Sequence, residues 1–176
     1  MIDKSKRWTK KRWAALLSPL FLVGIVSYFA LPYALTPRGT STIGLKYAGD
    51  TFHQCSRDTP QPDEASYWVP TRHEIAEADS LLWVMLQGRE MRGLRLPAVV
   101  PFHRQYIGFK RGGVRLIYVN AFADLGYVES DDWNDWFNWA ILGKPVSACD
   151  GGRYFWGAVY NPETREYEEP QFNGAI

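Results

Sequence analysis

Residues 104–122 read RQYIGFKRGGVRLIYVNAF, and this stretch decides the predicted fold. It holds two runs, 104–110 and 114–122, that are rich in β-branched and aromatic residues and alternate with a period of two, as expected of β-strands. The residues between them, Arg111-Gly112-Gly113, form a hairpin signal. The stretch therefore predicts two antiparallel strands joined by a tight turn.

A second pair of strands is predicted near the end of the chain. Residues 154–160 read YFWGAVY, and residues 165–172 read REYEEPQF. They flank Asn161-Pro162-Glu163-Thr164, a turn sequence in which Pro162 presets one backbone dihedral. We therefore expect a second antiparallel hairpin after the first.

A helix is predicted upstream of both hairpins, from Thr71 to about residue 87. Thr71 and Glu74 fit a capping box at its start, and Gly88 can end it. One face of this helix carries apolar residues at helical spacing, namely Ile75, Ala78, Leu82, Met85 and Leu86. The polar residues Glu74, Glu77 and Ser80 lie off that face. The pattern indicates an amphipathic helix that covers a hydrophobic core.

Together these elements predict an α+β domain in which one helix packs on an antiparallel four-stranded sheet. A cystatin-like arrangement is the nearest familiar topology, by analogy alone. Between the hairpins, residues 131–142 read DDWNDWFNWAIL. The acidic residues at the start of this run favour a second short helix containing Trp133, Trp136 and Trp139.

The N-terminal part of the chain predicts a membrane anchor. Residues 13–35 read WAALLSPLFLVGIVSYFALPYAL without a charged residue, which is long enough for a helix to cross a hydrocarbon core of roughly 30 Å. Six of the first twelve residues are basic, so the N-terminus is expected in the cytoplasm. The predicted layout is a cytoplasmic tail at 1–12, a transmembrane helix at 13–35, a stalk rich in Pro, Gly, Ser and Thr at 36–50, and an exported domain at 51–176.

The same apolar segment admits two alternatives to an uncleaved anchor. A cleaved signal peptide has an apolar stretch of about 7–15 residues followed by small residues at the cleavage site, whereas this stretch ends in Pro32-Tyr33-Ala34-Leu35. A lipoprotein needs a cysteine close behind the apolar segment, and the first cysteine here is Cys55. The sequence therefore favours the anchor.

The two cysteines of the chain, Cys55 and Cys149, are expected to form a disulfide. Exported domains persist in an oxidising environment, and the pair lacks the Cys-x-x-Cys spacing of redox motifs and zinc sites. The alternative is a cysteine nucleophile, which would require one of the two to remain unpaired in that compartment.

Charge argues against one class of partner. The chain has 20 Lys and Arg against 19 Asp and Glu. Without the six basic residues and Asp3 of the first twelve, 14 basic and 18 acidic residues remain, so the expected exported part is mildly acidic. No nucleic-acid partner is expected, because phosphate recognition needs a basic surface.

No pattern in the sequence predicts a cofactor, a metal site or a catalytic centre. His53, His73 and His103 match no common zinc spacing. The acidic run at 131–135 lacks the loop pattern of a calcium site and is interpreted as a helix start. The turn Asp150-Gly151-Gly152 is interpreted as structural, because no partner base accompanies Asp150.

Several motifs taken together resemble a family of small exported bacterial proteins of uncharacterised function. The likeness extends from about Trp68 to Gly174, and it rests on WVP at 68–70, RQY at 104–106, IYVNAF at 117–122, CDGG at 149–152, FWGAVY at 155–160 and FNG at 172–174. The resemblance implies a bacterial protein with a single exported domain, and therefore an inner-membrane anchor and a periplasmic domain. It implies no activity and no catalytic residues. Residues 133–141 depart from the family pattern.

The favoured function is a non-enzymatic envelope protein whose domain binds a protein partner. Trp133, Trp136 and Trp139 are candidate contacts, because Trp is frequent at interface hot spots, and burial beneath the sheet is the alternative for these rings. The presence of a membrane anchor and the absence of a catalytic set are the reasons for this choice.

Two other functions remain open. An envelope enzyme would use Arg104, Tyr106, Asn120 and Asp150, if the fold groups them at one end of the sheet. A small-ligand binder would need an apolar pocket lined by Phe109, Tyr118 and Trp156. The candidate functional patch taken from these alternatives comprises Arg104, Tyr106, Asn120, Asp150 and Trp156.

Overall fold

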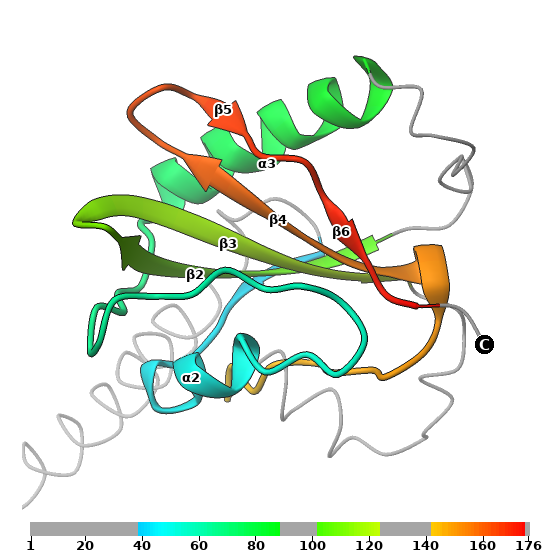
Figure 1. Ribbon diagram of the computed structural model, residues 1–176. Helices are drawn as coiled ribbons and strands as arrows, with labels where there is room; N and C mark the ends of the chain where they lie inside the picture. Colours follow the sequence, from blue (N-terminus) through cyan, green and yellow to red (C-terminus); the bar gives the residue numbers. More distant parts are fainter. Residues whose placement is uncertain (1–38, 89–101, 124–141, 175–176) are drawn as a thin grey trace, which may run out of the picture. The chain divides into compact units, whose positions relative to one another are not determined.

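A computed structural model of the protein describes residues 39–88, 102–123 and 142–174 (Figure 1). These residues form an α+β fold in which six strands make one mixed sheet. The predicted fold class is therefore confirmed. The strands are β1 (Thr40–Thr42), β2 (Phe102–Arg111), β3 (Val114–Ala123), β4 (Phe155–Asn161), β5 (Glu166–Tyr167) and β6 (Gln171–Phe172).

The first predicted hairpin is the centre of this sheet. Strands β2 and β3 pair antiparallel along their whole length, from Phe102 opposite Ala123 to Arg111 opposite Val114. Strand β4 pairs antiparallel with β3 on its other side. The short β1 pairs with β2 in parallel, with Thr40 opposite Arg104. The sheet is mixed because β1 is parallel to β2. It has six strands, whereas the sequence predicted an antiparallel sheet of four.

The second predicted hairpin is divided. Its first strand is β4, but the run expected at 165–172 forms two short strands, β5 and β6, which pair with different parts of β4. Pro170 lies between them. Proline has no backbone N–H to donate to a sheet and so is disfavoured within a strand.

The predicted helix is confirmed as α3 (Arg72–Gly88). Its capping box forms as expected, since the backbone N–H of Thr71 donates to the Glu74 carboxylate at 2.8 Å. The backbone N–H of Glu74 in turn donates to the Thr71 hydroxyl at 3.3 Å. These two bonds satisfy backbone groups that a helix start would otherwise leave without a partner.

The sheet is covered on both faces, and α3 lies on one of them (Figure 1). On this face, which we call the helix side, Ile75, Ala78 and Leu82 of α3 pack in one cluster with side chains of β2, β3 and β4. The opposite face carries a second cluster, which includes Ile43, Phe52 and Tyr118 among its buried members. Side chains alternate between the two faces along each strand, so neighbouring residues of one motif belong to different clusters.

The folded domain begins earlier than the predicted boundary at residue 51. Residues assigned to the stalk form β1, the 3₁₀ helix η1 (Leu45–Tyr47) and the short helix α2 (Ala48–Thr51). Ile43 and Ala48 are fully buried. A composition rich in Gly, Ser and Thr predicts a linker, but here pairing with the distant β2 and burial in the second cluster order the segment.

Two predicted segments lie outside the described residues, namely the membrane anchor at 13–35 and the helix containing Trp133, Trp136 and Trp139. Within the described ranges, no helix is long and apolar enough to cross a membrane.

Candidate functional site

A buried ion pair joins α3 to the sheet on the helix side. The Arg104 guanidinium donates from Nε to Oδ1 of Asp79 at 2.7 Å and from a terminal nitrogen to Oδ2 at 3.2 Å. The Tyr106 hydroxyl donates to the same carboxylate at 2.7 Å, and Arg104 also donates to the Phe102 carbonyl oxygen. Asp79 and Arg104 expose 7% and 6% of their surface. Both charges are therefore removed from water. Loss of either residue would leave the other as an unpaired buried charge.

This ion pair changes the titration of nearby tyrosines. Burial raises the pKa of Tyr106 well above its ordinary value, and the negative charge of Asp79 raises it further. Burial also raises the pKa of Tyr167, again with a contribution from Asp79. The Tyr167 hydroxyl donates to the Ala78 carbonyl oxygen at 2.8 Å. Both hydroxyls act as hydrogen-bond donors to α3, and neither is poised as a base near neutral pH.

The opposite face holds a second polar network, centred on Arg57. Its guanidinium donates to the Tyr118 hydroxyl at 3.2 Å, to Oδ1 of Asn120 at 2.5 Å and to Oδ1 of Asn173 at 2.8 Å. Arg57 is 8% exposed. Within the described part of the chain, no carboxylate forms an ion pair with it. Three neutral oxygens therefore solvate this buried cation.

The ring of Tyr118 is held in place partly by a glycine on the neighbouring strand. A Cβ atom on Gly157 would come within 2.1 Å of the Tyr118 hydroxyl oxygen. Only glycine at this position lets the tyrosine lie across β4 and reach Arg57. Burial raises the pKa of Tyr118, whereas the Arg57 charge lowers it.

A row of side-chain amides on the same face binds the backbone of residues 144–148, which we call the strap. Gln105 donates to the Lys144 carbonyl oxygen at 2.9 Å, Asn120 to that of Val146 at 2.8 Å and Asn173 to that of Ala148 at 2.6 Å. The backbone N–H of Val146 returns a bond to Oε1 of Gln105 at 2.8 Å. Alternate residues of the strap are thus hydrogen-bonded, as in an extended strand.

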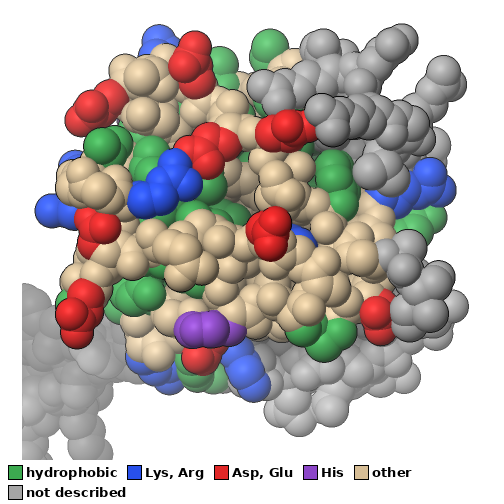
Figure 2. All heavy atoms as spheres, viewed as in Figure 1, with side chains coloured by type: hydrophobic (Ala, Val, Ile, Leu, Met, Phe, Trp, Pro, Cys, Tyr) green, Lys and Arg blue, Asp and Glu red, His purple; other side chains and the backbone are tan. Residues whose placement is uncertain are grey.

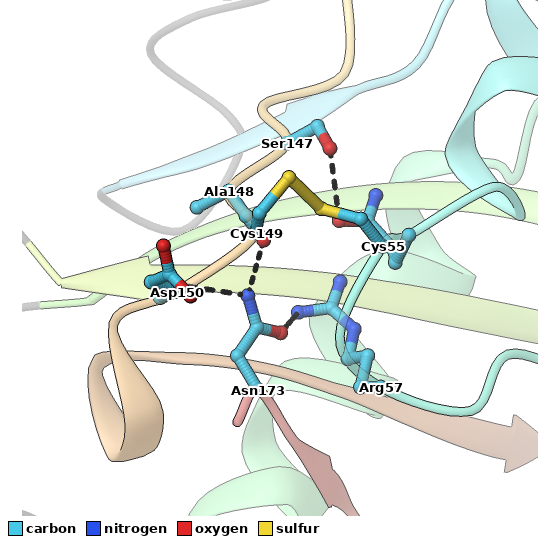
Figure 3. Close-up of a disulfide and its surroundings, with 8 residues drawn as sticks. Cys55, Arg57, Ser147, Ala148, Cys149, Asp150 and Asn173 are labelled. Carbon is cyan, nitrogen blue, oxygen red and sulfur yellow. Dashed lines mark hydrogen bonds between the residues drawn. A yellow bond between two sulfur atoms is a disulfide. The ribbon is translucent and has the colours of Figure 1, made fainter. Parts of the chain in front are cut away.

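The disulfide closes the end of the strap. Cys55 and Cys149 are bonded, with their Cα atoms 4.9 Å apart, so the predicted bridge is present. Both cysteines are exposed. Asn173 lies beside the bridge, between Arg57 and the chain around Cys149, and also contacts the Asp150 carbonyl oxygen at 3.4 Å (Figure 3). The bridge and the amide row therefore fix the same stretch of chain.

The structure divides the predicted functional patch between the two networks. Arg104 and Tyr106 belong to the helix side, where Trp156 is also fully buried in the first cluster. Asn120 belongs to the opposite face, bonded to Arg57 and the strap. Asp150 is exposed beside Cys149 and contributes its backbone carbonyl to the Arg57 network through Asn173. Arg104, Tyr106 and Trp156 thus share the helix side, whereas Asn120 and Asp150 belong to the network on the opposite face.

The three aromatic residues considered for a ligand pocket are also divided. Trp156 is in the helix-side cluster, whereas Tyr118 and Phe109 are in the opposite one. All three are buried.

No group of three or more His, Cys, Asp or Glu side chains that could hold a metal ion occurs among residues 39–88, 102–123 and 142–174.

Sequence reasoning missed two residues that organise these networks. Asp79 follows Ile75 by four positions and precedes Leu82 by three, so it lies on the apolar face of α3. An acid on a buried helix face needs a cationic partner, and this signal predicts an ion pair such as that with Arg104. Arg57 lies in a polar segment without periodicity, where no local signal distinguishes it from a solvated arginine.

The surface seen in Figure 2 carries acidic and basic side chains interspersed, with no continuous basic area among the described residues on that face. Comparison with protein-family models, with curated proteins and with solved structures found no match to this chain.

Proposed function

We propose that the chain is a single-pass membrane protein whose exported domain binds a protein partner without acting as an enzyme. Residues 13–35 would form the anchor, with the N-terminus in the cytoplasm. The resemblance to small exported bacterial proteins supports an inner-membrane location and a periplasmic domain. The disulfide between Cys55 and Cys149 supports export, because such bonds persist in oxidising compartments.

The observation that carries the binding proposal is the exposed apolar surface at the C-terminal half of α3. Residues 81–86 read LLWVML, and only Leu82 of this run is fully buried. Trp83 is 40% exposed and Val84 is 64% exposed. The solvent-facing side of a helix that packs on a sheet is ordinarily polar. Exposed aromatic and aliphatic side chains together are typical of a surface that contacts another protein.

Trp83 is also fixed in position before any partner arrives. Its ring lies over the Arg104 guanidinium, with the guanidinium carbon 5.5 Å from the ring centroid. Arg104 is itself held by Asp79. A ring ordered by a cation–π contact loses little conformational freedom on binding, which favours its use as an anchoring residue.

The hydrogen bonds that the polar motif residues make within the fold support a role other than catalysis. Arg104, Tyr106 and Asn120 each bond to structural groups of the fold, as described above. The bonds of Arg104 and Tyr106 already hold α3 and are not available to a substrate.

The test is site-specific photocrosslinking of the full-length chain in its native membranes. A photoreactive residue is placed at Val84, and the matched control is placed at the exposed Thr164 in the turn after β4. We expect one saturable adduct of defined mass from position 84, lost when Trp83→Ala is added, and none from position 164. Equal adducts at both positions, or no adduct at 84, would contradict the proposal.

A further inference from the structure

The strap is bound almost entirely through its backbone. The amides of Gln105, Asn120 and Asn173 each donate to one of its carbonyl oxygens, at alternate residues 144, 146 and 148. Among the described residues, the strap contributes one side-chain bond, from the Ser147 hydroxyl to Oε1 of Gln54 at 3.3 Å. Recognition of an extended backbone at alternate positions is how proteins bind peptides by strand addition. Here side-chain amides supply the donors that a sheet edge would supply.

The amide row is covered by the strap in this structure. Gln105 is fully buried, and Asn120 and Asn173 are 2% and 5% exposed. Without the strap, each amide would lose a carbonyl acceptor and become open to solvent. Water or a second polypeptide backbone would then replace the bonds that the strap now makes.

The strap itself could leave without disturbing the core. Lys144, Ser147 and Cys149 are exposed, and Pro145 and Val146 are half-buried. None of residues 144–149 belongs to either hydrophobic cluster. Figure 1 shows this segment at the side of the sheet away from α3.

Two attachments hold the ends of the strap. At its start, the Gly143 carbonyl oxygen accepts a bond from the backbone N–H of Gly44 at 2.9 Å. At its end, the disulfide ties Cys149 to Cys55. The disulfide adds a cross-link to the chain that already continues from Asp150 into β4, and it raises the effective concentration of the strap over the amide row. Reduction would leave the main chain as the covalent restraint at the end nearest Asn173, so a free peptide would compete more readily.

We propose that the amide row is a binding site for extended polypeptide backbone, kept closed by the strap and opened when the Cys55–Cys149 disulfide is reduced. This inference rests on the proposed function of protein binding and names a second surface for it. The reductant is a dithiol. Its two thiols transfer two electrons and two protons to the bond between Sγ of Cys55 and Sγ of Cys149, which leaves two protein thiols and one disulfide in the donor.

Peptide binding to the full-length protein tests the site. The probe is a fluorescent peptide with the strap sequence GKPVSA (residues 143–148), added to the protein in detergent with and without dithiothreitol and followed by anisotropy. We expect the reduced protein to bind at least about tenfold more tightly than the oxidised one, which corresponds to 1.4 kcal/mol. A peptide N-methylated at the position of Val146 cannot donate to Gln105 and is the matched control. It should lose about tenfold in affinity.

Hydrogen exchange on the same samples shows whether the sheet survives reduction. We expect faster exchange of the Val146 amide with β3 amides unchanged. Equal peptide affinity in both redox states would overturn the proposal, and so would equal affinity of the two peptides. Loss of protection in β3 together with the strap would overturn it as well, because the device needs an intact sheet. Crosslinking at Val84, which tests the proposed function, is performed on the oxidised protein. Its outcome therefore does not depend on whether the strap opens.

Discussion

Arg57 donates a hydrogen bond to Asn173 at 2.8 Å, across 116 residues of sequence. The contact joins the segment that precedes α3 to the residues that follow β6. Asn173 in turn donates to the Ala148 carbonyl oxygen, one residue before Cys149. A polar network and a disulfide thus converge on the same part of the opposite face, so the segment before α3, the strap and the residues after β6 are held together there (Figure 3).

The first prediction concerns the geometry of Arg57. Arg57→Lys keeps the positive charge, but one ammonium group cannot reach Tyr118, Asn120 and Asn173 together. At least one buried acceptor then lacks a donor, which costs about 1–3 kcal/mol of unfolding free energy. Urea denaturation measures the loss. The exposed Arg72→Lys is the control and should change stability little. Equal stability of the two variants would show that the three bonds contribute nothing.

The second prediction concerns the ion pair that holds α3. Asp79→Asn leaves Arg104 buried without its counter-charge, and breaking a buried pair in this way costs about 3–5 kcal/mol. The matched control is Glu77→Gln on the same helix, whose partner Arg165 has a side chain 64% exposed. Because Arg165 is exposed and Glu77 is only half-buried, solvent screens this pair, and such a pair contributes about 0–1 kcal/mol. Denaturation of both variants should separate them clearly, and similar losses would refute the assignment of Asp79 as the anchor.

The third prediction concerns a close approach within the sheet. Gly157→Ala places a Cβ atom 2.1 Å from the Tyr118 hydroxyl oxygen and 2.6 Å from its ring carbon. Because Arg57 and burial hold that ring, overpacking should cost about 1–3 kcal/mol. Gly49→Ala in α2 has no atom within 4 Å of the added carbon and should be neutral or slightly stabilising. Thermal unfolding distinguishes the two. A neutral Gly157→Ala would mean that the ring can move.

The fourth prediction is an alkaline loss of stability. The pKa of Tyr167 is raised in the folded protein, so above the ordinary tyrosine pKa of about 10 the unfolded chain loses its proton first. Stability is therefore complete below about pH 10 and falls as the pH rises beyond it. Tyr167→Phe should cost about 0.5–1.5 kcal/mol at pH 7 through the bond to Ala78.

The same variant should also make the alkaline decline less steep, which unfolding measured at pH 7 and pH 11 determines. Tyr47→Phe, at a half-buried ring on the opposite face, is the control. An unchanged decline in the Tyr167 variant would disprove the assignment.

Local signals in the sequence predicted the central elements well. The capping box at Thr71 and Glu74 sets the start of α3, and the Arg111-Gly112-Gly113 turn sets the register of β2 and β3. Both depend on residues within a few positions of one another. The disulfide was predictable for another reason, because only two cysteines exist and the anchor implied an oxidising compartment.

Long-range contacts account for what the sequence did not predict. Strand β1 is ordered by pairing with β2, more than sixty residues away, and its composition alone resembles a linker. Arg57 acquires its role from Tyr118, Asn120 and Asn173, none of which is near it in sequence. The patch prediction placed residues of several motifs at one end of the sheet, but it did not assign each residue to one of the two faces, and Asn120 lies on the face opposite to Arg104.

The central claim is an exported domain whose strap is closed by the Cys55–Cys149 bond, and thiol labelling of the native protein tests it most directly. Cells expressing the full-length chain are treated with a membrane-permeant maleimide before lysis, and the mass of the purified protein is measured with and without prior reduction. The account predicts no label on the unreduced protein and two labels after reduction. Stoichiometric labelling of both cysteines without reduction would contradict both the bond and the exported location.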